Sequence, residues 1–220
     1  MVRKKPMDQI LAMIGECKNL LILGCDGCAG VYQEGGRKQV ELMKTAIEMA
    51  EEVKKGRKVN ILTDVVERQC ESSFCASVVN PVIHNVDAIL SLGCGVGVQV
   101  LADMYPNTLI IPGHDTMFIG VEDRESGMFH ELCKACGSCL LYETGGICPV
   151  ARCAKSLLNG PCGGQSKGKC EVGGWKKDCA WVLIYNRLKD RERLDLFTVF
   201  RAPKDFREMQ HPREFSASGG

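Results

Sequence analysis

The sequence predicts an α/β fold in which a small parallel sheet, with helices between its strands, precedes a loop-rich domain built around cysteine. Short apolar runs alternate with helix-period segments over residues 1–122, as is typical of parallel strands joined by crossover helices. Eight of the fourteen cysteines lie between residues 133 and 179, interspersed with glycines. We therefore expect domains at 1–122 and 123–200, followed by a charged tail at 201–220.

The first strand and the helices on either side of it have clear sequence signals. Residues 6–17 predict a helix with Pro6 in its first turn, and residues 19–25 (NLLILGC) predict a strand buried on both faces. Residues 37–55 predict a longer helix, which ends at Gly56. The apolar stripe of this helix comprises Val40, Met43, Ile47, Ala50 and Val53.

The remaining segments of the first domain continue the alternation. Strands are predicted over residues 58–66, 86–94 and 108–113, and a helix over residues 95–105. Strands joined in this way make right-handed crossovers, so we expect a small Rossmann-like or flavodoxin-like sheet. Such sheets bind ligands beyond the carboxyl ends of their strands.

Cysteines follow three consecutive predicted strands. They are Cys25, Cys28, Cys70 and Cys94. Loops converge at that edge of a parallel sheet and helix N-termini there favour anions, so these thiols predict a metal cluster, with Cys75 as a competing ligand. The alternative is that they are small buried hydrophobes. Cys17 lies on a helix face, where we expect a buried structural thiol.

The segment GCGVG at residues 93–97 is similar to part of a nucleotide-binding fingerprint. It follows a predicted strand and precedes a predicted helix, but the full G-x-G-x-x-G pattern is absent and Cys94 lies inside it. We favour the alternative, in which the glycines permit a tight turn and close packing.

Composition and charge argue against several classes of protein. The 28 basic and 27 acidic residues nearly balance and aromatic residues make up 6%, so a nucleic-acid-binding surface is not expected. No segment is long enough to span a membrane, and the run LLILG is too short for a signal-peptide core. We expect a cytoplasmic protein, where thiols stay reduced and fourteen cysteines indicate metal binding.

The second domain has the spacing of an iron–sulfur protein. Cys133, Cys136 and Cys139 form a C-x2-C-x2-C pattern, and Cys148 precedes a proline, as in ferredoxin-type clusters. Four further cysteines follow: Cys153, Cys162, Cys170 and Cys179. Eight thiolates fit two [4Fe–4S] clusters, and the cysteines at the strand ends would hold a third. Zinc at one site is the main rival, and the pairing of cysteines stays open.

Two helices and a tail complete the predicted second half. Residues 149–160 and 176–190 predict helices, and Trp181 on the second is expected in the core. The tail at 201–220 is charged and lacks periodicity, so it is either a loose terminus or a docking arm.

Three polar side chains near these cysteines have open roles. Lys155 and Lys167 either offset the charge of a cluster or are solvated surface residues. His130 lies three residues before Cys133, but eight cysteines suffice without it.

Several of these segments together resemble the methylenetetrahydrofolate reductase C-terminal family. The resemblance covers about residues 18–203 and is carried by VERQCE, LGCGVGVQ, CKACGSC, TGGICPVARCAKSLLNGPCGG, KCEV and DCAWVLIYNRL. It implies a non-catalytic electron-transfer subunit whose partner is a flavin-containing barrel subunit. That partner reduces methylenetetrahydrofolate to methyltetrahydrofolate in the reductive acetyl-CoA pathway. The family pattern favours Cys70 over Cys75 as a ligand.

Two other functions remain open at this point. The chain could be a structural scaffold that binds zinc or an iron–sulfur cluster without a redox role, or an independent enzyme that binds a small ligand at the sheet edge. Further redox subunits or a ferredoxin are additional partner candidates for the electron-transfer reading.

Overall fold

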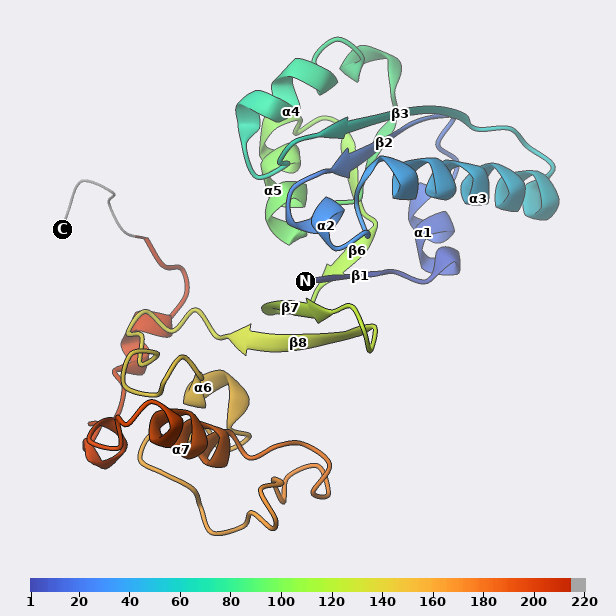
Figure 1. Cartoon of the computed structure of the whole chain (residues 1–220). Coiled ribbons are helices and arrows are strands. Elements are labelled where there is room, and N and C mark those ends of the chain that lie inside the picture. Colours follow the sequence, from blue (N-terminus) through green and yellow to red (C-terminus); the bar gives the residue numbers. More distant parts are fainter. Residues whose placement is uncertain (215–220) are drawn as a thin grey trace. The chain divides into compact units, whose positions relative to one another are not determined.

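The computed structural model describes residues 1–214, with Lys55 described by its backbone alone. The chain divides into two compact units, of which the first is Met1–Met117 and the second begins at Phe118 (Figure 1). Each unit has a hydrophobic core of its own. None of the helices in the described residues is long and apolar enough to cross a membrane.

A parallel sheet of four strands organises the first unit. The strands are β2 (Asn19–Cys25), β3 (Asn60–Val66), β4 (Ala88–Ser91) and β5 (Leu109–Pro112). They lie in the order β3-β2-β4-β5, and all neighbouring pairs are parallel, which confirms the predicted sheet. This order is the one with which flavodoxin-like sheets begin, and it places the topological switch point between β2 and β4.

Helices cover both faces of this sheet. The helices α1 (Met7–Ile14) and α3 (Arg37–Lys55) pack on one face, and α4 (Ser72–Val79) and α5 (Gly95–Met104) pack on the other (Figure 1). The side chains of β2 alternate between the two cores, because a strand turns successive side chains to opposite faces. The apolar run NLLIL is therefore continuous rather than alternating.

The long helix α3 reaches further than the strand that it covers. Val53, predicted in its apolar stripe, is 84% exposed, whereas Val40, Met43 and Ile47 are buried. A helix of 19 residues is about 28 Å long and a strand of 7 residues about 23 Å. The last turn of α3 therefore extends beyond the end of the strand, where Val53 lies in solvent.

The first unit also contains elements that the sequence pattern does not predict. The strand β1 (Val2–Lys4) pairs antiparallel with β6 (His114–Thr116), and α4 follows β3. A short helix α2 (Cys28–Val31) and a 3-10 turn at Ile83–Asn85 complete the unit.

The second unit is mostly loop. It contains an antiparallel hairpin of β7 (Ile119–Asp123) and β8 (Met128–Cys133), then α6 (Pro149–Arg152) and α7 (Ala180–Asp190). Two 3-10 turns lie at Leu196–Thr198 and Phe206–Met209. A small core forms around Ile147, Trp181, Ile184 and Leu188. The domain boundary predicted at residues 122–123 falls inside β7.

Both helices predicted in the second unit are shorter than expected. The predicted helix 149–160 ends at Arg152, because Ser156 adopts a left-handed backbone (φ 51) and its Oγ donates to the Val150 carbonyl at 3.0 Å. The predicted helix 176–190 begins only at Ala180, after an N-cap at Cys179. A cysteine therefore borders each helix: Cys153 follows α6, and Cys179 precedes α7.

Candidate metal centres

Four predicted ligands lie at the carboxyl ends of neighbouring strands in the first unit. They are Cys25 at the end of β2, Cys28 at the start of α2, Cys70 after β3, and Cys94 at the N-cap of α5, and we call them the strand-end group. The loops after β2 and β3 approach closely. A Cβ on Gly27 would lie 3.1 Å from Cγ of Arg68 and 3.7 Å from Sγ of Cys25.

Two of these thiols lie near enough to Cys25 to affect its ionisation. Burial raises the pKa of Cys25, and repulsion from Cys94 and Cys28 raises it further. Cys28 and Cys70 are exposed, and Cys94 is half-buried. Thiolates gathered in this way repel one another, and a bound cation would relieve that repulsion.

Cys75 lies beside the strand-end group but belongs to the core. It is fully buried among the side chains between the sheet and α4, and its Sγ donates to the Gln69 carbonyl at 3.4 Å. Burial raises its pKa from 9.0 to about 11, with smaller contributions from Cys25 and Cys70. A thiol that resists ionisation is a poor metal ligand, so this geometry favours Cys70.

The buried side chain of Gln69 joins the two strands at the switch point. Its Nε2 donates to the carbonyls of Leu23 at 2.8 Å and Gly24 at 3.0 Å, and its Oε1 accepts from Oγ of Ser91 at 2.5 Å. Sequence reasoning missed this residue, although an amide within VERQCE directly after a strand was a signal. The crevice where doubly wound sheets bind ligands is thus occupied by the chain itself.

The glycines of GCGVG make room for that glutamine. A Cβ on Gly93 would lie 2.4 Å from Oε1 of Gln69, and a Cβ on Gly97 would lie 2.6 Å from its Cβ. A side chain at either position would therefore clash with Gln69. Close packing therefore accounts for the spacing of these glycines.

The cysteines of the C-x2-C-x2-C loop and the cysteine before α6 form a second set, which we call the loop group. They are Cys133, Cys136, Cys139 and Cys148. Cys133 ends β8, and Cys148 is the N-cap of α6, which packs against β8. The backbone N–H of Ala135 donates to Sγ of Cys133 at 3.3 Å. Within the described residues no contact is recorded between the four thiols themselves.

The C-terminal segment lies over this loop. Lys204 donates to the Ser138 carbonyl, and Arg213 donates to the Ala135 carbonyl at 2.5 Å. Gly137 has a positive φ of 78°, and a Cβ there would lie 2.7 Å from Oε2 of Glu208. Residues 204–213 therefore pack on the loop that carries the C-x2-C-x2-C pattern. The end of the predicted tail, 215–220, lies outside the described residues.

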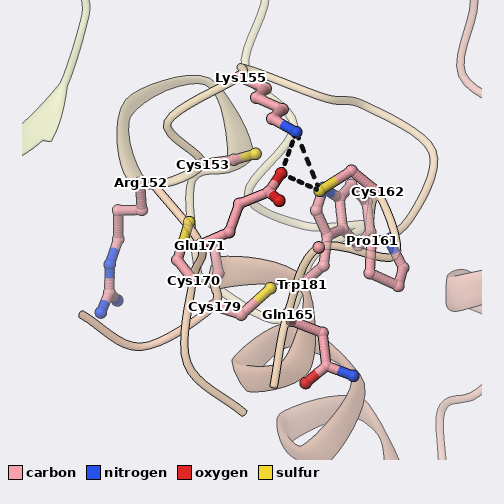
Figure 2. A pocket seen from close by; sticks show the side chains of 12 residues that line it. Arg152, Cys153, Lys155, Pro161, Cys162, Gln165, Cys170, Glu171, Cys179 and Trp181 are labelled. Atoms are coloured by element: carbon pink, nitrogen blue, oxygen red, sulfur yellow. Dashed lines mark hydrogen bonds and ion pairs between the residues drawn. The ribbon is translucent and has the colours of Figure 1, made fainter. Parts of the chain in front are cut away.

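The last four cysteines line one hollow, and we call them the hollow group (Figure 2). They are Cys153, Cys162, Cys170 and Cys179. An antiparallel bridge between Lys169 and Asp178 joins the segments that carry Cys170 and Cys179, and the N–H of Cys170 donates to the Lys177 carbonyl at 2.8 Å. The N–H of Cys179 donates to the Gly168 carbonyl at 2.8 Å, and Cys153 directly follows α6. The structure thus brings together four thiols that are spread over 27 positions of the sequence.

A lysine and a glutamate share this hollow with the thiols. Lys155 Nζ donates to Sγ of Cys162 at 3.6 Å and pairs with the Glu171 carboxylate. Figure 2 shows Glu171 reaching in among the four sulfur atoms. The hydrogen bond to Glu171 raises the pKa of Lys155, and the hydrogen bond from Lys155 lowers the pKa of Glu171. Both side chains are therefore charged at neutral pH.

The donor set of the hollow group fits an iron–sulfur cluster, since four thiols face one space. Within residues 1–214, no three His, Cys, Asp or Glu side chains are already arranged as they would be around a single metal ion. The other open side chains lie elsewhere. His130 and Lys167 are exposed, and Cys17 packs against the first core with its Sγ donating to the Asn19 carbonyl at 3.3 Å.

Comparison with known proteins finds a family similarity in the second half of the chain. A family model described as methylene-tetrahydrofolate reductase C terminal matches residues 111–207, which contain the loop group and the hollow group. No curated protein and no solved structure matches the chain. The resemblance to this family is thus confirmed over residues 111–207.

Proposed function

We propose that this chain is the electron-transfer subunit of a methylenetetrahydrofolate reductase and that its cysteines hold two or three [4Fe–4S] clusters. The observation that carries the proposal is the hollow group, whose four thiols line one space within the segment that the family model matches. Cysteine thiolates are the usual ligands of such clusters, four to a cluster. When bound, each cluster would take up and release single electrons.

The three groups divide the proposed ligands. The hollow group would hold one cluster and the loop group a second, which assigns all eight cysteines of the second unit. The strand-end group would hold a third, supported by the position of its four cysteines at the carboxyl ends of neighbouring strands and by the effect of Cys94 and Cys28 on the pKa of Cys25. Loops, rather than the core, carry most of these thiols, and this lets backbone N–H groups approach the sulfur atoms, as Ala135 does at Cys133.

The partner in this proposal is a flavin-containing barrel subunit. It reduces methylenetetrahydrofolate to methyltetrahydrofolate in the reductive acetyl-CoA pathway, which consumes two electrons and two protons per turnover. The chain would deliver those electrons one at a time to the flavin from an external donor, such as a further redox subunit or a ferredoxin.

One alternative is weakened by a specific contact. An independent enzyme would need a ligand site at the switch point of the sheet, and the side chain of Gln69 fills that crevice. The other alternative is a scaffold that binds metal without a redox role. In its zinc-binding form it predicts stoichiometric zinc and no acid-labile sulfide.

Anaerobic purification of the whole chain tests the proposal. We expect a brown protein with iron and acid-labile sulfide for two or three four-iron clusters, and with reducible paramagnetic signals. The isolated chain should not turn over methylenetetrahydrofolate, whereas the flavin subunit should be active in its presence. Stoichiometric zinc without sulfide would refute the electron-transfer role, and robust folate reduction by the isolated chain would favour an independent enzyme.

A further inference from the structure

Two charged side chains of the hollow converge on one sulfur atom. Lys155 Nζ donates to Sγ of Cys162 at 3.6 Å, and Oε1 of Glu171 lies 3.7 Å from the same sulfur. The ammonium and carboxylate groups also pair with each other. Figure 2 shows both interactions meeting at Cys162, on one side of the four thiols.

Folding stability does not account for this arrangement. The side chains of Lys155 and Glu171 are 44% and 35% exposed, and exposed ion pairs contribute little to stability. The chain nevertheless makes room for the glutamate, because a Cβ on Gly164 would overlap its carboxylate. A carboxylate beside the sulfur of an anionic cluster is unfavourable by itself, and the lysine offsets it.

The charge of Lys155 has a predictable effect on a cluster held at Cys162. Reduction adds one negative charge to the cluster, so a nearby cation stabilises the reduced form and raises the reduction potential. A nearby carboxylate has the opposite effect. Hydrogen bonds to the ligand sulfurs act in the same direction as the cation, because they draw charge from the thiolate.

We propose that Lys155 is a positioning residue that raises the reduction potential of the cluster bound by the hollow group, and that Glu171 holds its ammonium group at the sulfur of Cys162. The inference rests on the proposed function, since it requires a cluster at these four cysteines. It adds which of the clusters is tuned, by which side chain, and in which direction.

Potentials measured on charge variants of the full chain test this inference. The variants are Lys155→Met, Lys155→Arg and Glu171→Gln, each purified anaerobically and titrated with paramagnetic resonance detection. The control is Arg193→Met, because the side chain of Arg193 is also 44% exposed and pairs with Asp195 at 3.0 Å but does not line the hollow. Iron and sulfide contents accompany every titration.

Opposite shifts of a single cluster are expected. Lys155→Met should lower the reduction potential of this cluster by up to about 59 mV. For a one-electron couple, that shift is about a tenfold change in the ratio of reduced to oxidised cluster. Glu171→Gln should raise the potential, Lys155→Arg should keep it near the wild-type value, and Arg193→Met should leave it unchanged. If Lys155→Met loses its iron, the upward shift in Glu171→Gln still decides the question.

The contradictory results separate this inference from the proposed function. Iron and sulfide present at wild-type levels, with no shift in either Lys155→Met or Glu171→Gln, would overturn the tuning role alone. Shifts of the same sign in both variants, or an equal shift in Arg193→Met, would indicate a merely structural ion pair. A wild-type chain without iron and sulfide would overturn the proposed function and this inference together.

Discussion

At the scale of single residues, Gln69 connects the fold to the candidate site. Its amide bridges the ends of β2 and β4, and the glycines at 93 and 97 leave room for it. A ligand at this edge must therefore bind outside the crevice, among the loops that carry the strand-end group. The same glutamine explains why a glycine pattern like that of a nucleotide site is present without the complete fingerprint.

Replacing Gln69 by alanine should destabilise the first unit. The change leaves the buried Leu23 and Gly24 carbonyls and the Ser91 hydroxyl without this partner, at a cost of about 2–4 kcal/mol. Urea denaturation of the full chain measures the loss. Gln99→Ala is the control, because Gln99 is an exposed side chain on α5 that donates to the Gly95 carbonyl at 2.9 Å. Equal midpoints for the two variants would contradict the bridging role.

On the proposed assignment, replacing Cys28 and Cys94 by alanine should remove one of the three clusters. Both lie in the strand-end group, so the double variant should lose about four irons per chain while the signals of the second unit persist. The matched control is Cys17→Ala, since the Cys17 thiol donates to a backbone carbonyl and packs on the core. Iron content unchanged from wild type would return the strand-end cysteines to a structural role.

At the scale of elements, Asp87 ties the amino ends of β2 and β4 together. Its Oδ2 accepts from the backbone N–H groups of Asn19 at 2.8 Å and Lys18 at 2.9 Å, and these hydrogen bonds lower the pKa of Asp87 below its ordinary 3.8. A carboxylate whose pKa falls on folding stabilises the fold above its unfolded pKa, and this contribution is lost as pH falls through the folded pKa.

Asp87→Ala should therefore be less stable than the wild type at neutral pH. The difference in free energy of unfolding between the two proteins should shrink below about pH 3.8. Denaturation midpoints measured from pH 7 downward test this dependence. The exposed Asp103 on α5 supplies the comparison variant, Asp103→Ala, which should show no such difference. If the stability difference between Asp87→Ala and the wild type stays constant with pH, the charge of the carboxylate is not its cause.

Elements whose own residues decide their structure were predictable from the sequence. The strand at Asn19–Cys25 is apolar on both faces, and the helix at Arg37–Lys55 has a buried stripe and a glycine after its end. The hairpin β7–β8 was not, because its strands carry no strong apolar alternation. The helix predicted over 149–160 ends at Arg152, because Ser156 adopts a left-handed backbone and its hydroxyl donates to the Val150 carbonyl, which the apolar pattern does not indicate.

The candidate site was predictable in its composition but not in its grouping. Spacing identified the cysteines, since C-x2-C-x2-C is a local pattern. Sequence alone could not group Cys153 with Cys179, because a bridge between Lys169 and Asp178 and the loops around them bring these thiols to one hollow. Gln69 and Glu171 were missed for the same reason: each acts on residues far away in the sequence.

At the scale of the whole molecule, the C-terminal segment is more firmly held than its composition suggests. The guanidinium of Arg201 is buried, pairs with Glu143 at 2.7 Å and lies 5.6 Å from the ring of Trp181. Beyond it, Lys204 and Arg213 donate to the loop that carries Cys133, Cys136 and Cys139. Residues 201–214 are therefore held by contacts and do not form a loose terminus.

Ending the chain after Pro203 should weaken its affinity for the proposed flavin-containing subunit by about tenfold, or about 1.4 kcal/mol, as measured by co-purification. The truncation keeps Arg201 and its contacts, so the second unit should stay folded, while the charged segment that covers the cysteine loop is lost. Ending the chain at residue 214 is the control. Unchanged co-purification of the shorter chain would remove this segment from the interface.

Residues 151–179, all of which the structure describes, include no buried residue. Ordering a backbone costs about 1–2 kcal/mol per residue, and this segment has little apolar burial to offset that cost. On the proposed assignment, ligation by the hollow group supplies the missing free energy, as metal binding does in other small metal-dependent domains. The availability of iron and sulfide would then set the lifetime of the protein in the cell. A newly made chain that failed to receive its cluster would offer proteases an open loop, and would be degraded before it could occupy a place on its partner.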